Sequence, residues 1–187
     1  ILGESRKHPN PLSSHTYNLL NKWVYEPNTH HKLSLTFEHF RDKFNGEHLS
    51  EIGGLNVIPD LSSMPSGIAS MYSHGAYKTT NENRRTQFTF RHDFTTKTPL
   101  FDHGFWQAYY QQTKVTQISN EIRQQIRPLP MIFERYRQGN YKRENLGLSA
   151  EFNKHWQQSE GVSHDFAYGL NYRHSRMEAS RYGDSIN

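Results

Sequence analysis

Hydrophobic and polar residues alternate along residues 16–41, a pattern that predicts two strands joined by a turn at residues 26–30. Alternation with a period of two places apolar side chains on one face of a strand and polar side chains on the other. Each arm runs for roughly ten residues, close to the ~9–11 that a tilted strand needs to cross a bilayer. The apolar face of this hairpin carries Tyr17, Leu19, Trp23 and Tyr25 in the first arm and Leu33, Leu35 and Phe37 in the second.

The same alternation returns further along the chain, so the sequence predicts about six strands. Two long polar segments, residues 42–84 and 115–142, separate the hairpins, and the first is expected to hold a short helix at residues 66–72. Connections therefore alternate between short and long, as in an up-and-down barrel with short periplasmic turns and longer extracellular loops. The later strands are expected within residues 85–94, 105–114, 146–152 and 166–172.

The predicted fold is all-β, an antiparallel up-and-down transmembrane β-barrel of which residues 1–187 form a portion. Six strands are fewer than the ~8 of a small closed barrel, and an open sheet would leave unpaired backbone groups in lipid. Because the chain begins with Ile1 and carries no signal peptide, we expect an internal portion of a larger barrel wall. The alternative is a soluble sandwich that buries the same apolar faces between two sheets. The residues expected to face lipid are Leu19, Trp23, Leu35, Phe37, Leu148 and Leu170.

The composition favours apolar stripes over a single compact core. Hydrophobic residues make up 33% of the chain and mean hydropathy is −0.94, yet aromatic residues reach 13%, which a disordered chain would lack. No apolar run approaches the ~18 residues of a membrane helix. The net charge of +4 has its signs mixed along the sequence, which argues against a nucleic-acid partner. The absence of cysteine excludes disulfides and thiolate metal sites, and no catalytic motif occurs, so no enzyme is expected.

Several segments are similar to TonB-dependent outer-membrane receptors, and most of all to the branch that takes up haem from haemoglobin or iron from transferrin and lactoferrin. They are the entry Asn10-Pro11-Leu12 and the strand stretches at residues 18–22, 32–38, 91–94 and 168–174. The resemblance implies a barrel of about twenty-two strands plugged by an N-terminal domain. This sequence holds no plug domain and no TonB-contact segment. The family's haem-coordinating histidines lie in the plug and in a later loop, so no ligand assignment carries over.

The resemblance implies a receptor in the outer membrane of a Gram-negative bacterium that imports haem or iron taken from a host protein such as haemoglobin. Its partners would be that host haemoprotein, or another iron-carrying protein, outer-membrane lipid, and TonB through the absent N-terminal part. Haem would be a transported ligand, with no cofactor bound tightly and no metal site. The alternatives are a transferrin, lactoferrin, siderophore or zinc receptor, or a surface β-sheet module that binds a partner and transports nothing.

The first long segment supplies the candidate contact residues. Methionine and aromatic side chains on an exposed loop can anchor a partner protein, although they can equally pack beneath the loop. Two histidines of the same segment, His48 and His74, are candidate haem contacts because neutral imidazole is a common metal ligand. Basic residues at positions 84–85, 123 and 135–137 could attract an acidic ligand. The candidate partner-binding residues are Met64, Ile68, Met71, Tyr72 and Tyr77.

Overall fold

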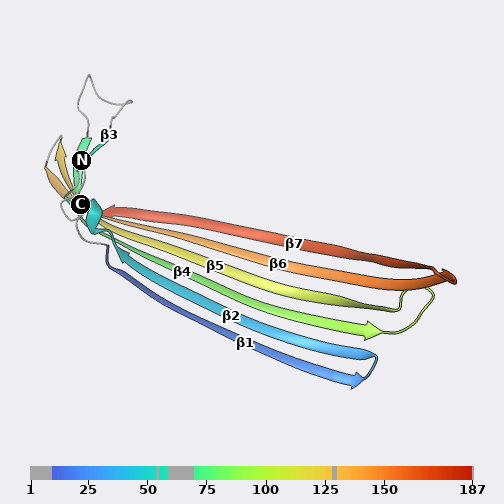
Figure 1. The fold of residues 1–187 in the computed structure, drawn as a ribbon. Helices are drawn as coiled ribbons and strands as arrows, with labels where there is room; N and C mark the ends of the chain where they lie inside the picture. The colour runs from blue at the N-terminus through green and yellow to red at the C-terminus, as the bar shows by residue number, and fades with distance from the viewer. Residues whose placement is uncertain (1–9, 54, 59–69, 128–129, 187) are drawn as a thin grey trace.

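A computed structural model describes residues 10–53, 55–58, 70–127 and 130–186 (Figure 1). The chain folds into one antiparallel sheet in which consecutive long strands are neighbours, in the order β1-β2-β4-β5-β6-β7, and the short β3 pairs with β4. Among the described residues no helix is long and apolar enough to cross a membrane. The strands are β1 (Leu12–Asn28), β2 (His31–Glu47), β3 (Leu55–Ile58), β4 (Ser70–Thr95), β5 (His103–Arg127), β6 (Met131–Ser159) and β7 (Val162–Ile186).

The register confirms the alternation predicted for the six arms. Residues directly opposite one another in an antiparallel pair point to the same side of the sheet. Large apolar side chains therefore gather on one face as a continuous band, and neighbouring rings touch: the Phe37 and Phe88 centroids lie 4.9 Å apart. One row of the band crosses all six strands in register through Trp23, Leu35, Phe90, Ala108, Leu148 and Tyr172.

Burial in this sheet is the reverse of that in a soluble domain. No apolar side chain is buried among the described residues, and large ones such as Leu170 stay 64% exposed. The four buried polar residues all lie on the face opposite the band, where the register also places the ion pairs of Arg85 with Glu38 and of Arg91 with Asp93. These buried residues are Ser34, His74, Glu121 and Asn145.

On the side of the long connections the band ends in one register row on the four central strands, at Phe37, Phe88, Tyr110 and Leu146. On β1 it extends four residues further out, to Tyr17, and on β7 it ends two residues further in, at Tyr172.

Both predicted long loops are wrong in extent, because the strands continue far into them. β2 runs on to Glu47 and β4 begins at Ser70, so residues 42–47 and 70–84 are strand. β5 reaches Arg127 and β6 begins at Met131, which leaves three residues between them. Past the apolar band polar residues predominate on both faces, and apolar residues such as Ile118 and Ile122 recur only every fourth position. The alternation that marks a strand therefore disappears although the backbone still pairs. Of the predicted helix, residues 70–72 are strand and residues 66–69 lie outside the described part of the chain.

Tight turns close the other end of the sheet, as the sequence predicted for the short connections (Figure 1). Between β6 and β7, Gly161 has φ +87°, a conformation that glycine adopts without strain. Between β4 and β5, Asp102 accepts a hydrogen bond from the His155 backbone N–H at 2.8 Å and pairs with Lys154 at 2.8 Å. The short connections are therefore fixed to the ends of the strands.

We expect Gly147→Val to lower the free energy of unfolding by about 1–3 kcal/mol, the usual cost of overpacking. A Cβ atom at Gly147 would lie 2.1 Å from the ring of Tyr109, its register partner on β5. Urea unfolding measures the loss. Adding Tyr109→Ala should recover part of it, with a coupling energy of at least about 0.5 kcal/mol.

The matched control for this test is Gly139→Val on the same strand. A Cβ atom there meets the Tyr141 ring at 3.4 Å, an ordinary contact distance, so the loss should be smaller. Equal losses at the two glycines, or a coupling energy of zero with Tyr109, would contradict the packing described here.

Candidate functional site

The candidate site lies where the first long connection folds back on β4. After β2 the chain makes a single 3₁₀ turn, η2 (Leu49–Glu51), and docks on the strand through backbone hydrogen bonds. The His48 N–H donates to the Tyr77 carbonyl oxygen at 2.8 Å, and the Gly53 N–H donates to the His74 carbonyl oxygen at 2.9 Å. Gly53 has φ +73°, which favours glycine at this reversal. Residues 48–53 are thereby held against residues 74–77.

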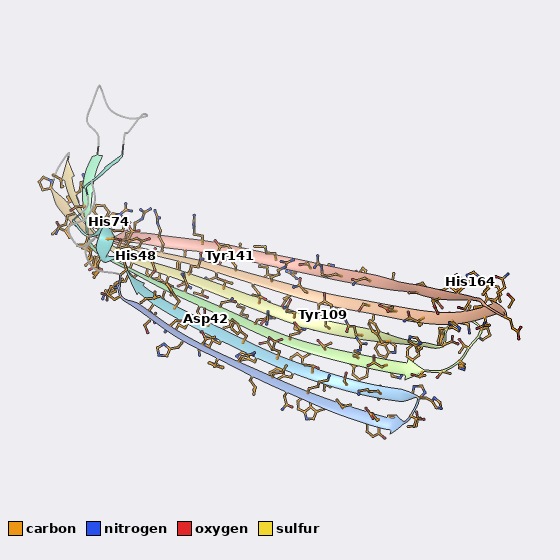
Figure 2. The ribbon with its side chains drawn as sticks, in the orientation of Figure 1. Asp42, His48, His74, Tyr109, Tyr141 and His164 are labelled. Atoms are coloured by element: carbon orange, nitrogen blue, oxygen red, sulfur yellow. The ribbon has the colours of Figure 1, made fainter. Side chains whose placement is uncertain are left out.

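This docking brings together three residues that the sequence singled out. The His48 ring stacks on the Tyr77 ring with centroids 4.5 Å apart, and the His74 ring stacks on Tyr77 at 5.5 Å. His48 Nε2 also lies 3.0 Å from the Thr79 hydroxyl, within hydrogen-bond distance. Figure 2 shows His48 and His74 at the same end of the sheet, far from His164 at the opposite end. We refer to His48, His74 and Tyr77 as the histidine–tyrosine cluster.

Burial sets the protonation of the cluster. His74 is only 7% exposed, and its burial lowers the pKa of the imidazole below the usual value. The charge of Glu121 raises this pKa, but by a smaller amount. Burial likewise raises the pKa of the Tyr77 phenol, with Glu121 adding to the effect. At neutral pH both groups are uncharged. A neutral imidazole is the form that coordinates iron.

Basic residues lie on the same face beside the cluster. Arg123 is the register partner of His74, Arg135 is the partner of Glu121, and Arg137 is the partner of Ser119. The carboxylate of Glu121 is buried and pairs with Arg123 at 2.7 Å. Three of the basic residues that the sequence marked as able to attract an acidic ligand therefore share a face with the two imidazoles.

A polar hollow of about 250 Å³ adjoins the cluster on this face. It shares Thr79 with the His48 contact, and Gly139 is among its lining residues. Ligand pockets usually measure about 300–1,000 Å³. This hollow is smaller, so the sheet offers one wall of a site rather than an enclosed pocket. Its lining is Thr79, Asn81, Gln117, Ile118, Ser119, Arg137, Gln138, Gly139, Tyr141 and Arg181.

The other candidate contact residues are not brought into this site by anything the structure describes. Met64 and Ile68 lie outside the described residues. Met71 and Tyr72 belong to β4 and pair in register with Val57 and Asn56 of β3, but their side chains also fall outside the described part. Of the predicted partner-contact residues, Tyr77 is the one whose side chain the structure describes, and its ring stacks against both His48 and His74.

Two groups in the structure were missed at the sequence level. Arg181 lines the polar hollow, and Thr79 contacts His48; both lie where the alternation had faded. At the far end, Trp106 Nε1–H donates to His92 Nδ1 at 3.1 Å, and His92 Nε2 lies 3.0 Å from His31 Nδ1. That chain of rings crosses three strands on the apolar face.

Metal chemistry at this site would rest on one or two imidazoles. In the described part of the chain no group of three or more histidine, cysteine or acidic residues could hold a bare metal ion. Haem iron, which needs only an axial ligand or two from protein, fits the donors present.

Comparison with known protein families gave no match, and a comparison with curated proteins gave none either.

Acidification should loosen the docking of residues 48–53. Because the folded pKa of His74 is depressed, its contribution to stability is present above the ordinary histidine value of about 6.5 and is lost as pH falls below it. We expect hydrogen-exchange protection of the His48 and Gly53 amides to decrease between about pH 7.5 and pH 5. The measurement is amide exchange by NMR or mass spectrometry, corrected for intrinsic rates.

The Thr98 amide, which donates to the Phe101 carbonyl oxygen at 2.8 Å at the other end of the sheet, is the internal reference and should not change. In His74→Gln, which has no titrating group, the pH dependence at His48 and Gly53 should flatten. If protection stays constant in the natural protein, His74 does not control the docking.

Proposed function

We propose that this chain forms part of the wall of a transmembrane barrel, in a TonB-dependent outer-membrane receptor that imports haem taken from a host protein such as haemoglobin. The observation that carries the membrane part is the reversed burial. A barrel in lipid has an outward apolar band and a polar interior. This sheet has most of its exposed large apolar side chains on one face and its buried polar residues on the other.

The borders of the band support the same proposal. Aromatic residues mark both borders of the band, as interfacial girdles do: Tyr17 and Tyr172 toward the long connections, and Tyr25 and Tyr168 toward the short turns.

The edges of the sheet explain why the chain would be only part of the wall. Among the described strands, β1 pairs with β2 alone and β7 with β6 alone. Each unpaired backbone group in lipid costs several kcal/mol, so membrane sheets close into barrels. Further strands of the same receptor would therefore have to pair with β1 and β7.

The histidine–tyrosine cluster supports haem as the cargo. A buried neutral imidazole suits haem iron, the Tyr77 ring offers a stacking surface, and the arginines of the same face suit the two propionates. The cluster lies on the face opposite the apolar band, which in a barrel is the side of the lumen. Resemblance to receptors for haem from haemoglobin points to the same ligand, while uptake of iron from transferrin, lactoferrin or a siderophore is the alternative that the assay below separates.

Single cysteines should test which face meets lipid, since the chain has none of its own. We expect Leu148→Cys in intact outer membranes to resist a water-soluble maleimide and to react with a lipid-soluble one. Ser149→Cys, the next residue on the opposite face, should show the reverse preference. Equal reaction of both cysteines with the water-soluble reagent would support the soluble-sheet alternative.

Growth on haemoglobin as sole iron source should test the cargo. In cells carrying the receptor we expect the double variant His48→Ala, His74→Ala to slow growth on haemoglobin while leaving growth on ferric citrate unchanged. His164→Ala, an exposed histidine at the opposite end of the sheet, is the control. If the double variant grows normally on haemoglobin but poorly on transferrin or a siderophore, that iron source is the cargo instead.

A further inference from the structure

A row of basic side chains follows the apolar band on the side of the long connections. On five adjacent strands, a lysine or arginine of the same face stands four positions beyond the residue at which the apolar band ends. Side chains four positions apart in a strand point to the same face of the sheet. We refer to these residues as the basic row: Arg41 on β2, Arg84 on β4, Lys114 on β5, Lys142 on β6 and Arg176 on β7.

Four members of the basic row are direct neighbours. Arg41 pairs with Arg84 and Arg84 with Lys114 in register, and Lys114 pairs in turn with Lys142. Adjacent strands lie only about 4.8 Å apart. Like charges directly opposite one another destabilise a sheet. Neighbouring negative groups are therefore needed to offset the repulsion within the basic row.

The protein supplies part of that charge but leaves Lys114 without any. Glu82 pairs with both Arg41 and Arg84, the latter at 2.7 Å, and Glu144 pairs with Lys142 at 2.8 Å. On β7, Arg176 pairs with Glu178 at 2.8 Å. Lys114 is exposed, stands between two cations and makes no ion pair with the described residues.

Lys43 adds to this surplus from the next row outward. It is exposed, lies on the same face as Arg41 and likewise makes no ion pair in the described part of the chain. The pKa of Glu144 is lowered to about 2, first by Lys142 and then by Gln112, so this acid stays ionised and occupied at physiological pH. Positive charge at Lys43 and Lys114 is therefore available to an outside partner.

The opposite border of the band lacks such a row. Among the described strands, the lysine or arginine on this face at the short-turn end is Lys154. Its ammonium group is held by Asp102 and by the Thr98 carbonyl oxygen, both at 2.8 Å. The two borders of the apolar band thus differ in charge, which points to one anionic leaflet on the side of the long connections.

We propose that the basic row binds the phosphate groups of anionic lipid headgroups in the leaflet on the long-connection side. The proposal rests on the proposed function, because it takes the apolar band as the part that spans the membrane. The row continues the apolar face directly, so acyl chains would lie against the band while the phosphates meet the cations. Arginine presents a fork that matches phosphate oxygens, and lysine stems can lie along apolar surface toward them.

The test uses the detergent-purified protein and diphosphoryl lipid A as the probe, with bound lipid counted by native mass spectrometry. We expect the double variant Lys43→Gln, Lys114→Gln to lose about thirtyfold in affinity for this lipid, as removal of two surface cations implies. Lys22→Gln with Lys97→Gln removes the same charge from elsewhere and is the matched control. Dephosphorylated lipid A should bind the natural protein no better than it binds the double variant.

A second variant keeps the test decisive if charge removal disturbs folding. Lys114→Glu would place an acid between Arg84 and Lys142 and relieve the repulsion there, so it should fold at least as well and yet bind the lipid more weakly than Lys114→Gln. If millimolar inorganic phosphate displaces all of the bound lipid, the basic row binds free phosphate, and the lipid proposal is overturned.

The outcomes separate this proposal from the one on which it rests. If Leu148→Cys is lipid-exposed but the two lysine substitutions leave lipid affinity within about twofold, the basic row binds no lipid and the barrel wall stands. If the protein is monodisperse without detergent and Leu148→Cys reacts with the water-soluble reagent, there is no membrane border and both proposals fail.

Discussion

The backbone hydrogen-bond ladder is the constraint on which the rest of this structure depends. Among the described residues no apolar side chain is buried, so no hydrophobic core holds the sheet together from within. The long strands instead pair with their neighbours over nearly their whole length. Apart from local bulges, the inner strands therefore pair their backbone groups with adjacent strands, and such pairing is what lipid requires of any spanning structure.

Register is the second consequence of that ladder. A slip of one residue between two strands would move each side chain to the other face and mix the apolar band with the charged one. Local features oppose such a slip: the reversal at Gly161, the Asp102 contacts with β6, and the seat of the Tyr109 ring over Gly147. The chemistry of each face therefore depends on turns and glycines that carry no functional group themselves.

Extension of the strands past the apolar band gives the protein its two candidate binding regions. On the polar face, β4 holds His74 and Tyr77 on a regular strand, and only His48 is delivered by a turn. Sites built on strands are positioned more precisely than sites on loops. On the other face the same extension aligns the cations of neighbouring strands into one row. One pattern with a period of two thus places the histidine–tyrosine cluster on one face and the basic row on the other.

The sequence alone determined the elements whose two faces contrast. Alternation located the six arms, the turns at one end and the apolar face, because side chains of opposite polarity mark a strand directly. It failed at residues 70–84 and 115–127, where both faces are polar and only backbone pairing defines the strand. His48, His74 and Tyr77 could each be chosen from the sequence as candidates. Their contact, and the alignment of Arg84, Lys114 and Lys142, were decided by the tertiary structure, because only docking and cross-strand register bring residues so distant in sequence to neighbouring positions.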